Sequence, residues 1–159
     1  ITLGSELPAI TRPVVIDGST DDSFAANGNR PAVVLRGNGT ATIWTGLTLE
    51  AGSGGSTVRG LVIQNFYTGL MVAAGSAGNT IAGNDLGNLG TDGSLGGGAA
   101  NAYGIIVRSD NNTVGGTLAA DRNVASGNTS ANVVMDEATA TGNRIGDDGT
   151  PGARQDHGK

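Results

Sequence analysis

Two pairs of adjacent aspartates are the first residues in this sequence that could do chemistry. Asp21/Asp22 and Asp147/Asp148 could supply the acid and the base that glycoside hydrolysis needs on either side of the scissile bond. Adjacent residues of a strand point to opposite faces, and both pairs lie in loop-like surroundings of glycine, serine or threonine. The only histidine, His157, lies in a polar tail. We therefore expect these carboxylates to be solvated and assign no catalytic residue.

A further pair, Asp85 and Asp92, points to a metal ion. Together with the GTDG turn at residues 90–93, these residues could offer carboxylate and backbone oxygens to Ca²⁺. The spacing is neither that of an EF-hand nor that of the GGxGxD repeats of calcium-binding β-rolls. We therefore expect a long surface turn and no cofactor, with calcium bound by Asp85 and Asp92 as the alternative.

The composition excludes several classes of protein. Glycine supplies 29 of the 159 residues, aromatic residues are 3% and cysteine is absent, which argues against an aromatic core, a helical bundle and a disulfide scaffold. Short aliphatic runs such as AVVL and LVI argue against disorder. A net charge of −5 does not favour nucleic acid or an anionic membrane as a partner. No run approaches the roughly 18 apolar residues of a membrane span.

The aliphatic runs belong to a repeat of three segment types, each about four residues long and ended by glycine or asparagine. The step from Gly46 to Gly69 is 23 residues, as is the step from Thr57 to Thr80. Later steps are longer because residues 88–102 and 117–121 are inserted. The first type occupies residues 45–52, 68–75, 103–110 and 131–138, the second 56–60, 79–83 and 112–116, and the third 61–65, 83–88 and 122–128.

Short strands separated by residues that tolerate positive φ predict an all-β parallel β-helix with three strands per coil and about six coils. We place this single domain at residues 1–148, and a flexible polar tail at 149–159. Asn79, Asn112 and Asn143 are expected to form an internal ladder of amides between coils. The glycine-rich insertion 88–102 lies outside the strands, and function is to be sought there first.

A stripe of charged positions follows the first segment type. Aligned, it contains Glu50, Ala73, Arg108 and Asp136, and the N-terminal runs end similarly at Asp17 and Arg36. Opposite charges on neighbouring coils would form modest cross-strand pairs of about 0.2–1 kcal/mol. The alternative is a groove for a sugar or a cation.

Three aromatic residues lie near the strands. Trp44, Phe66 and Tyr67 would stack on sugar rings if they are exposed, whereas packing at the corners of the coil is the alternative. A column of Thr57, Thr80 and Thr113 raises ice binding as a minor hypothesis.

Several stretches of the chain resemble repeats of large bacterial extracellular proteins of the pectin-lyase-like superfamily. The resemblance covers roughly residues 1–148 and implies a right-handed helix. Lyases of this group hold Ca²⁺ with acidic residues and use an arginine or lysine as base, which makes Glu50, Arg108 and Asp136 its candidates here. The stretches are LPAITRPVVIDGST, GLTLEAGSGGSTVRGLVIQNF, GNTIAGNDLGNLGTDG and NNTVGGTLAADRNVASGN.

Because this superfamily includes enzymes, adhesins and stalks, the resemblance leaves function open. We expect a structural or adhesive segment of a secreted or surface-displayed bacterial protein, with ends that can stack on one another. The alternative is a polysaccharide-binding or lyase-like module built around Glu50, Arg108, Asp136 and Trp44. An extracellular or cell-surface location goes with both hypotheses.

Overall fold

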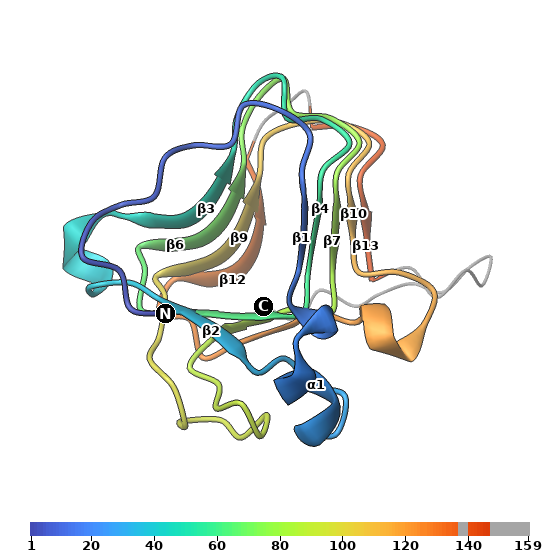
Figure 1. The fold of residues 1–159 in the computed structure, drawn as a ribbon. Coiled ribbons are helices and arrows are strands. Elements are labelled where there is room, and N and C mark those ends of the chain that lie inside the picture. The colour runs from blue at the N-terminus through green and yellow to red at the C-terminus, as the bar shows by residue number, and fades with distance from the viewer. Residues whose placement is uncertain (137–139, 147–159) are drawn as a thin grey trace.

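The three segment types form three parallel sheets. A computed structural model of the chain describes residues 1–136 and 140–146. Each sheet takes one strand from each coil, in the order in which the coils follow along the chain. The structure thus confirms an all-β parallel β-helix with three strands per coil (Figure 1).

The strands are short, as the turn residues require. One sheet contains β1 (Val15–Asp17), β4 (Thr57–Arg59), β7 (Thr80–Ala82), β10 (Thr113–Val114) and β13 (Arg144–Ile145). The second contains β2 (Val33–Arg36), β5 (Leu61–Gln64), β8 (Asp85–Gly87) and β11 (Val124–Ser126). The third contains β3 (Thr45–Leu49), β6 (Thr68–Val72), β9 (Tyr103–Val107) and β12 (Ala131–Met135).

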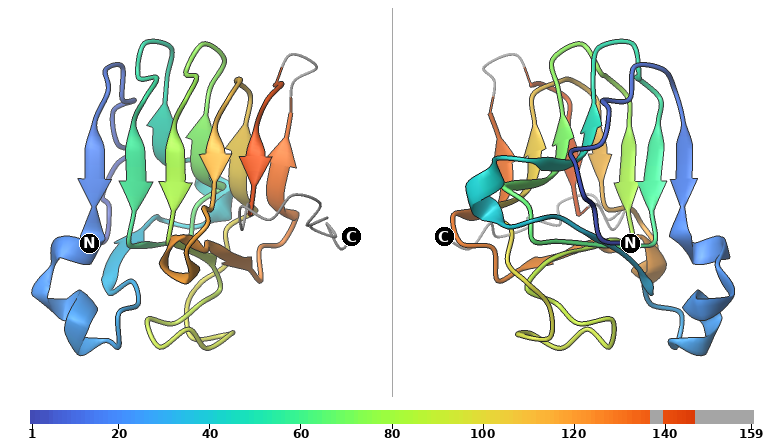
Figure 2. Two further views of the ribbon diagram at one scale, coloured as in Figure 1. Left: turned by 90° about the vertical axis from the view of Figure 1, so that its right-hand side faces the viewer. Right: turned by 60° about the vertical axis from the view of Figure 1, so that its left-hand side comes forward.

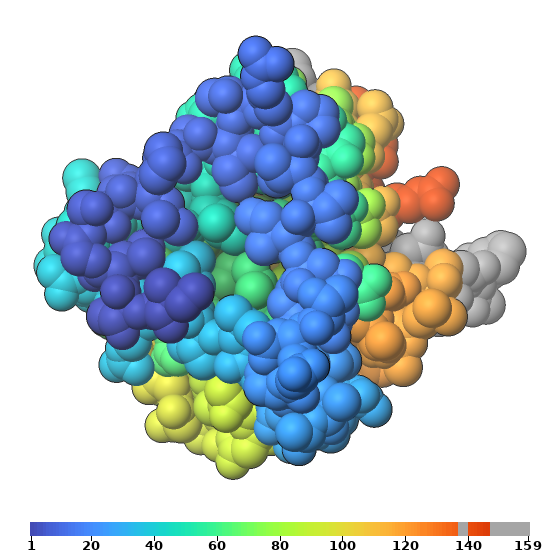
Figure 3. All heavy atoms as spheres, viewed as in Figure 1, coloured from blue at the N-terminus to red at the C-terminus, as the bar shows by residue number. Residues whose placement is uncertain are grey.

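The helix is right-handed. Figure 1 looks along its axis from the N-terminal end: the chain descends β1, crosses below along β2, rises through β3 and passes over to β4, so it turns clockwise as it recedes. Figure 3 shows in the same view how the first residues cover much of this end. Figure 2 shows the strands of the β1–β4–β7–β10–β13 sheet side by side.

Strands β2 to β13 make four complete coils within the described residues. An incomplete coil precedes them, in which β1 is regular while Thr2 and Ile10 form single bridges to Arg36 and Leu49. This is fewer than the roughly six coils expected, because residues 18–31 and most of residues 88–102 form loops outside the coil. The expected tail at 149–159 lies outside the described residues.

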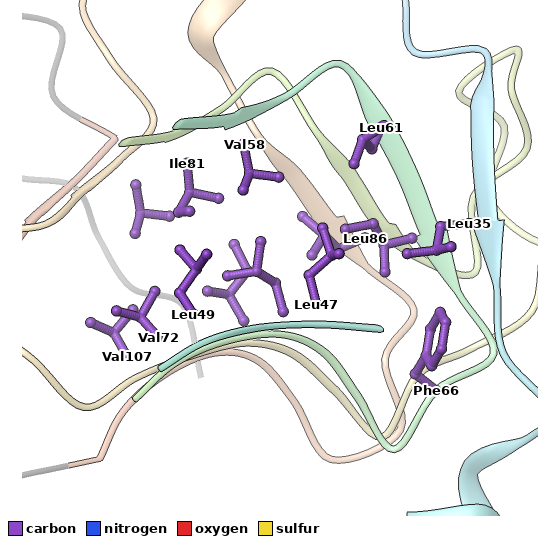
Figure 4. Close-up of a cluster of buried hydrophobic side chains, with 14 residues drawn as sticks. Leu35, Leu47, Leu49, Val58, Leu61, Phe66, Val72, Ile81, Leu86 and Val107 are labelled. Carbon is purple, nitrogen blue, oxygen red and sulfur yellow. The ribbon is translucent and has the colours of Figure 1, made fainter. Parts of the chain in front are cut away.

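Aliphatic side chains fill the interior between the three sheets. Val58 and Ile81 come from one sheet and face Leu49, Val72 and Val107 from another (Figure 4). Each of these five side chains is fully buried and stacks on its counterpart in the next coil. Repetition of the same small side chains therefore replaces aromatic bulk in the core.

The glycine of the first segment type is required by the close approach of successive coils. A Cβ on Gly46 would lie 2.5 Å from the carbonyl oxygen of Gly69, and one on Gly69 would lie 2.7 Å from that of Gly104. A Cβ on Gly104 would collide with the carbonyl of Asn132 in the same way. Asn132 itself carries a side chain, which is exposed at the last described coil.

The predicted asparagine ladder is confirmed. The Asn112 Oδ1 accepts hydrogen bonds from the backbone and side-chain nitrogens of Asn79, both at 2.9 Å. Asn143 Oδ1 accepts the equivalent two bonds from Asn112 at 2.8 and 3.0 Å. Ser56 continues the column by donating its backbone N–H to Asn79 at 2.9 Å. These amides satisfy backbone groups that the corner removes from the sheets.

Buried asparagines also occupy the other two corners, which the sequence did not predict. Asn84 accepts from the backbone N–H of Leu61 at 3.1 Å, and Asn123 accepts from that of Asn84 at 3.0 Å. At the third corner, Asn101 accepts from Phe66 at 2.9 Å. Every corner of the coil is thus held to the next coil by side-chain amides.

The N-terminal insertion contains a helix where the sequence predicted a loop. η1 (Gly18–Thr20) and α1 (Asp22–Ala26) follow β1, and Asp21 caps α1 by accepting a 2.9 Å bond from the backbone of Ser23. The hydrogen bonds from Ser23 lower the pKa of Asp21. The first aspartate pair is therefore part of a helix start, while Asp147, Asp148 and His157 lie outside the described residues. The remaining short turns are η2 (Thr40–Thr42) and η3 (Ala119–Asp121).

Replacing the central ladder residue should destabilise the fold. Asn112→Ala leaves two N–H groups of Asn79 without their acceptor, so we expect the free energy of unfolding to fall by about 2–4 kcal/mol in a urea titration followed by circular dichroism. The exposed Asn38 provides the control, because Asn38→Ala should change stability by less than about 0.5 kcal/mol. Equal effects of the two substitutions would contradict this account.

Candidate functional site

The outer face of the β2–β5–β8–β11 sheet is covered by loops, unlike an ordinary solvent-facing sheet surface. Val62 is fully buried there, although its neighbours Leu61 and Ile63 are the residues that point into the core. Gln64 is buried on the same face and accepts a 2.6 Å hydrogen bond from the backbone of Ala99 in the insertion. The loops therefore form a second packed layer outside the solenoid.

The covering loops come from different coils and project on one side of the molecule (Figures 1 and 2). Residues 18–31 follow β1, residues 88–102 follow β8, and residues 115–123 follow β10. Asn27 ties the first loop to the second by donating to the backbone oxygen of Thr91 at 2.6 Å. Arg30 adds a bond from Nη1 to the backbone oxygen of Asp92 and one from Nε to Asn27 at 3.3 Å.

Asp85 lies under these loops, at the first position of β8 on the covered outer face of the sheet. The register pairs it with Val62 on one side and Val124 on the other, so a carboxylate replaces an aliphatic side chain in an otherwise apolar column. Asp85 is only 6% exposed. Burial raises its pKa to about 6, and the positive charge of Arg30 offsets part of this rise.

A cavity of about 200 Å³ opens beside Asp85. Its apolar wall contains Phe24, Pro31 and Val124, and two arginines, Arg30 and Arg122, line it as well. Within residues 1–136 and 140–146, the Asp85 side chain has neither a hydrogen-bond partner nor an ion pair within 4.0 Å. A buried carboxylate, two arginines and apolar side chains thus line one small cavity, which makes it a candidate binding site.

The residues do not fit the calcium site that was the alternative for Asp85 and Asp92. Asp92 is exposed, and its Oδ1 accepts bonds from the backbone and hydroxyl of Ser94 at 2.9 and 2.6 Å, which lower its pKa. The guanidinium groups of Arg30 and Arg122 would repel a divalent cation beside Asp85. Across the described ranges, no three acidic, histidine or cysteine side chains gather as a metal site.

The charged stripe has the predicted register and forms an ion pair. Arg108 donates to one carboxylate oxygen of Asp136 through Nε at 2.8 Å and Nη2 at 2.6 Å. Ala73 separates this pair from Glu50, as the alignment predicted. The sequence grouped Asp17 and Arg36 with this stripe, which is wrong because these residues end strands of the two other sheets.

Asp17 instead lies beside Arg59, with 3.6 Å between a carboxylate oxygen and Nε. Both ion pairs connect equivalent positions on neighbouring coils, which is the cross-strand pairing expected from opposite charges.

The aromatic residues divide between core and surface. Phe66 is fully buried at a corner, and Trp44 is partly buried against the core, as corner packing predicts. Tyr67 is 38% exposed and forms an edge-to-face pair with Tyr103, with 5.5 Å between ring centroids. Tyr67 directly precedes β6, and Tyr103 is the first residue of β9. Trp44 directly precedes β3, at the position equivalent to Tyr67.

A larger hollow of about 470 Å³ lies at the last coil. Ala125, Val133 and Ile145 line it, one inward-facing residue from each of β11, β12 and β13. These three strands pair with a neighbour on one side only within the described part of the chain. Among residues 1–136 and 140–146, no side chain therefore closes the apolar interior of the solenoid at this end.

Arg30 and Arg122 were missed by sequence reasoning, because they precede their strands and line the cavity beside Asp85 only in the folded loops. The unusual position of Asp85 could have been found from the sequence, because the repeat alignment places this carboxylate at the position that Val62 occupies in the preceding coil.

Comparison with models of protein families, with curated proteins and with solved structures found no match. None of the helices in the described part of the chain has the length and apolar character needed to cross a bilayer.

The burial of Asp85 should make stability depend on pH. The folded protein holds a proton with a pKa of about 6, whereas the unfolded chain loses it near the ordinary value of 3.8, so the free energy of unfolding falls as pH rises through this window. Relative to Asp85→Asn, the wild type should lose about 1–2 kcal/mol between pH 4 and pH 7, measured by urea titrations at both values. A difference that does not change with pH would mean that folding does not raise the pKa of Asp85.

Proposed function

We propose that this chain is a rigid structural segment of a secreted or surface-displayed bacterial protein of the pectin-lyase-like type. The observation that carries the proposal is the accessible apolar end of the last coil, where three sheets have unpaired edges around a hollow of about 470 Å³ within the described residues. Unpaired strand edges around apolar side chains are a template for further strands. A further coil or a second copy of the chain would continue the sheets there.

The opposite end is suited to receive such a contact. The free edge of β1 carries Val15, whose side chain is 74% exposed, and Ile1 is 76% exposed. An association of this end with the last coil would be heterologous, so that copies add in one direction without closing a ring. A rod or filament is the expected assembly.

Asn132 limits how closely a coil can approach this end. The side chain stands where Gly46, Gly69 and Gly104 leave room for the carbonyl of the following coil. Its Oδ1 accepts a 2.9 Å hydrogen bond from Asn128, which fixes it across the end of β12. The contact is therefore expected to rest mainly on β11 and β13.

Substitutions on one strand test this end as an assembly surface. Val133 lines the hollow, whereas the next residue, Val134, points to the other face of β12. We expect wild-type protein to self-associate as its concentration rises in sedimentation velocity runs. Val133→Asp should shift it to monomer, and the matched control Val134→Asp should leave association unchanged.

Asn132→Gly provides a test in the opposite direction. Restoring the glycine column should allow closer stacking and strengthen association, with longer particles in electron micrographs. Discrete wild-type monomers at all concentrations, unaltered by Asn132→Gly, would rule out stacking through this end.

A carbohydrate-binding module is a second proposal, which the exposed Tyr67 and its half-buried partner Tyr103 favour. The tyrosine pair at the start of β6 and β9 is suited to stack on a sugar ring. The ion pair of Arg108 and Asp136 follows the other end of β9 and β12 in the same sheet, where it is suited to bind hydroxyl or carboxylate groups of a neighbouring sugar unit. Trp44 and Glu50 flank β3, the neighbouring strand of this sheet. No catalytic role is assigned to these residues.

Binding to acidic polysaccharides, measured by affinity electrophoresis, tests this second proposal. Tyr67→Ala and Arg108→Ala should each weaken retention by roughly 2- to 10-fold, because each removes a contact worth about 0.5–1.5 kcal/mol. Arg12→Ala, at an exposed arginine of the first coil, is the control. Retention that is absent, or equal in all variants, would remove this proposal.

A further inference from the structure

The carboxylate of Asp85 lacks a structural role that would explain its burial. Its neighbours in the column, Val62 and Val124, show that the position accommodates an aliphatic side chain. Asp85 nevertheless is 6% exposed and has no hydrogen-bond partner among the described residues. Burying such a group without partners costs free energy that a valine would not.

The surroundings of Asp85 define what could bind it. The carboxylate lines one side of the 200 Å³ cavity, and Arg30 and Arg122 line the same cavity. Two N–H groups of Arg30 are used on the backbone oxygens of Asn27 and Asp92, which fixes its guanidinium between the two loops. A ligand that complements both charges must carry a cationic donor for Asp85 and an anionic group for an arginine.

The remaining wall sets the size and polarity of the ligand. Phe24, Pro31 and Val124 present apolar surface, so the part of the ligand between its charged groups is small and aliphatic. The cavity is below the roughly 300–1,000 Å³ of sites for drug-sized molecules. A polysaccharide chain would not fit inside it.

We propose that this cavity binds a small α-amino acid, with its ammonium group on Asp85 and its carboxylate on Arg122 and Arg30. The ligand gives the buried carboxylate the donor that the chain does not supply. The loops from three different coils meet at the cavity, so the bound molecule would also hold them together on the outer face of the sheet. This binding is independent of end-to-end assembly.

Isothermal titration calorimetry with L-alanine tests the proposal directly. Three analogues each alter one feature: N-acetyl-L-alanine lacks the ammonium, ethylamine lacks the carboxylate, and L-lactate replaces the ammonium by a hydroxyl. We expect alanine to bind and each analogue to bind about 10- to 100-fold more weakly, because each loses a charged hydrogen bond.

Variants identify the residues. Asp85→Val copies the neighbouring positions and should abolish alanine binding without lowering the melting temperature, and Asp85→Asn provides a second variant of nearly the same shape. Arg122→Gln should weaken binding by about 10-fold or more, while Arg12→Gln on the first coil is the matched control and should have no effect.

Several outcomes would overturn the proposal. Lactate binding equal to alanine binding, unaffected by Asp85→Val, would make the cavity an anion site. Ethylamine binding equal to alanine binding would make it an amine site without a role for the arginines. No binding of alanine at millimolar concentration to the folded wild-type protein would exclude an amino-acid site.

Discussion

The distance between successive coils is the constraint on which the structure depends. Coils lie so close that a Cβ on Gly46 or Gly69 would collide with the backbone of the following coil. Buried amides such as Asn79 and Asn112 then fix the register at the corners, because each bonds to the backbone of its neighbour. The glycine column permits the close spacing of the coils, and the asparagine ladders hold each coil in register with the next. The aliphatic side chains of the core are therefore stacked by these backbone contacts and not by large side chains.

Because these contacts lie inside the coils and at their corners, loops of different lengths can be attached to the outside of the solenoid. The fold accommodates residues 18–31 and 88–102 because each of these loops leaves the coil and returns to it at a single corner. The loops then bury an outer sheet surface that would otherwise face water, and Val62 and Gln64 become part of a second layer. Asp85 acquires its unusual environment from this layer and not from the core.

From β3 onward, the sequence was sufficient to predict what the repeat controls: the strands, their register, the ladder of Asn79, Asn112 and Asn143, and the pairing of charges at Arg108 and Asp136. Each depends on residues at equivalent positions of neighbouring coils. The cavity beside Asp85 could not be predicted, because Arg30 and Arg122 reach it through loops with no counterpart in other coils. The same reason explains why α1 was missed.

The glycine column also determines where the protein can be lengthened. A duplicated coil inserted between β6 and β9 would place its carbonyl against Gly69 and its own glycine against the carbonyl of Gly104, so it could stack without moving the backbone. The same coil added after β12 would meet the side chain of Asn132. Internal duplication therefore keeps the glycine column intact, whereas the side chain of Asn132 hinders the addition of a coil after β12.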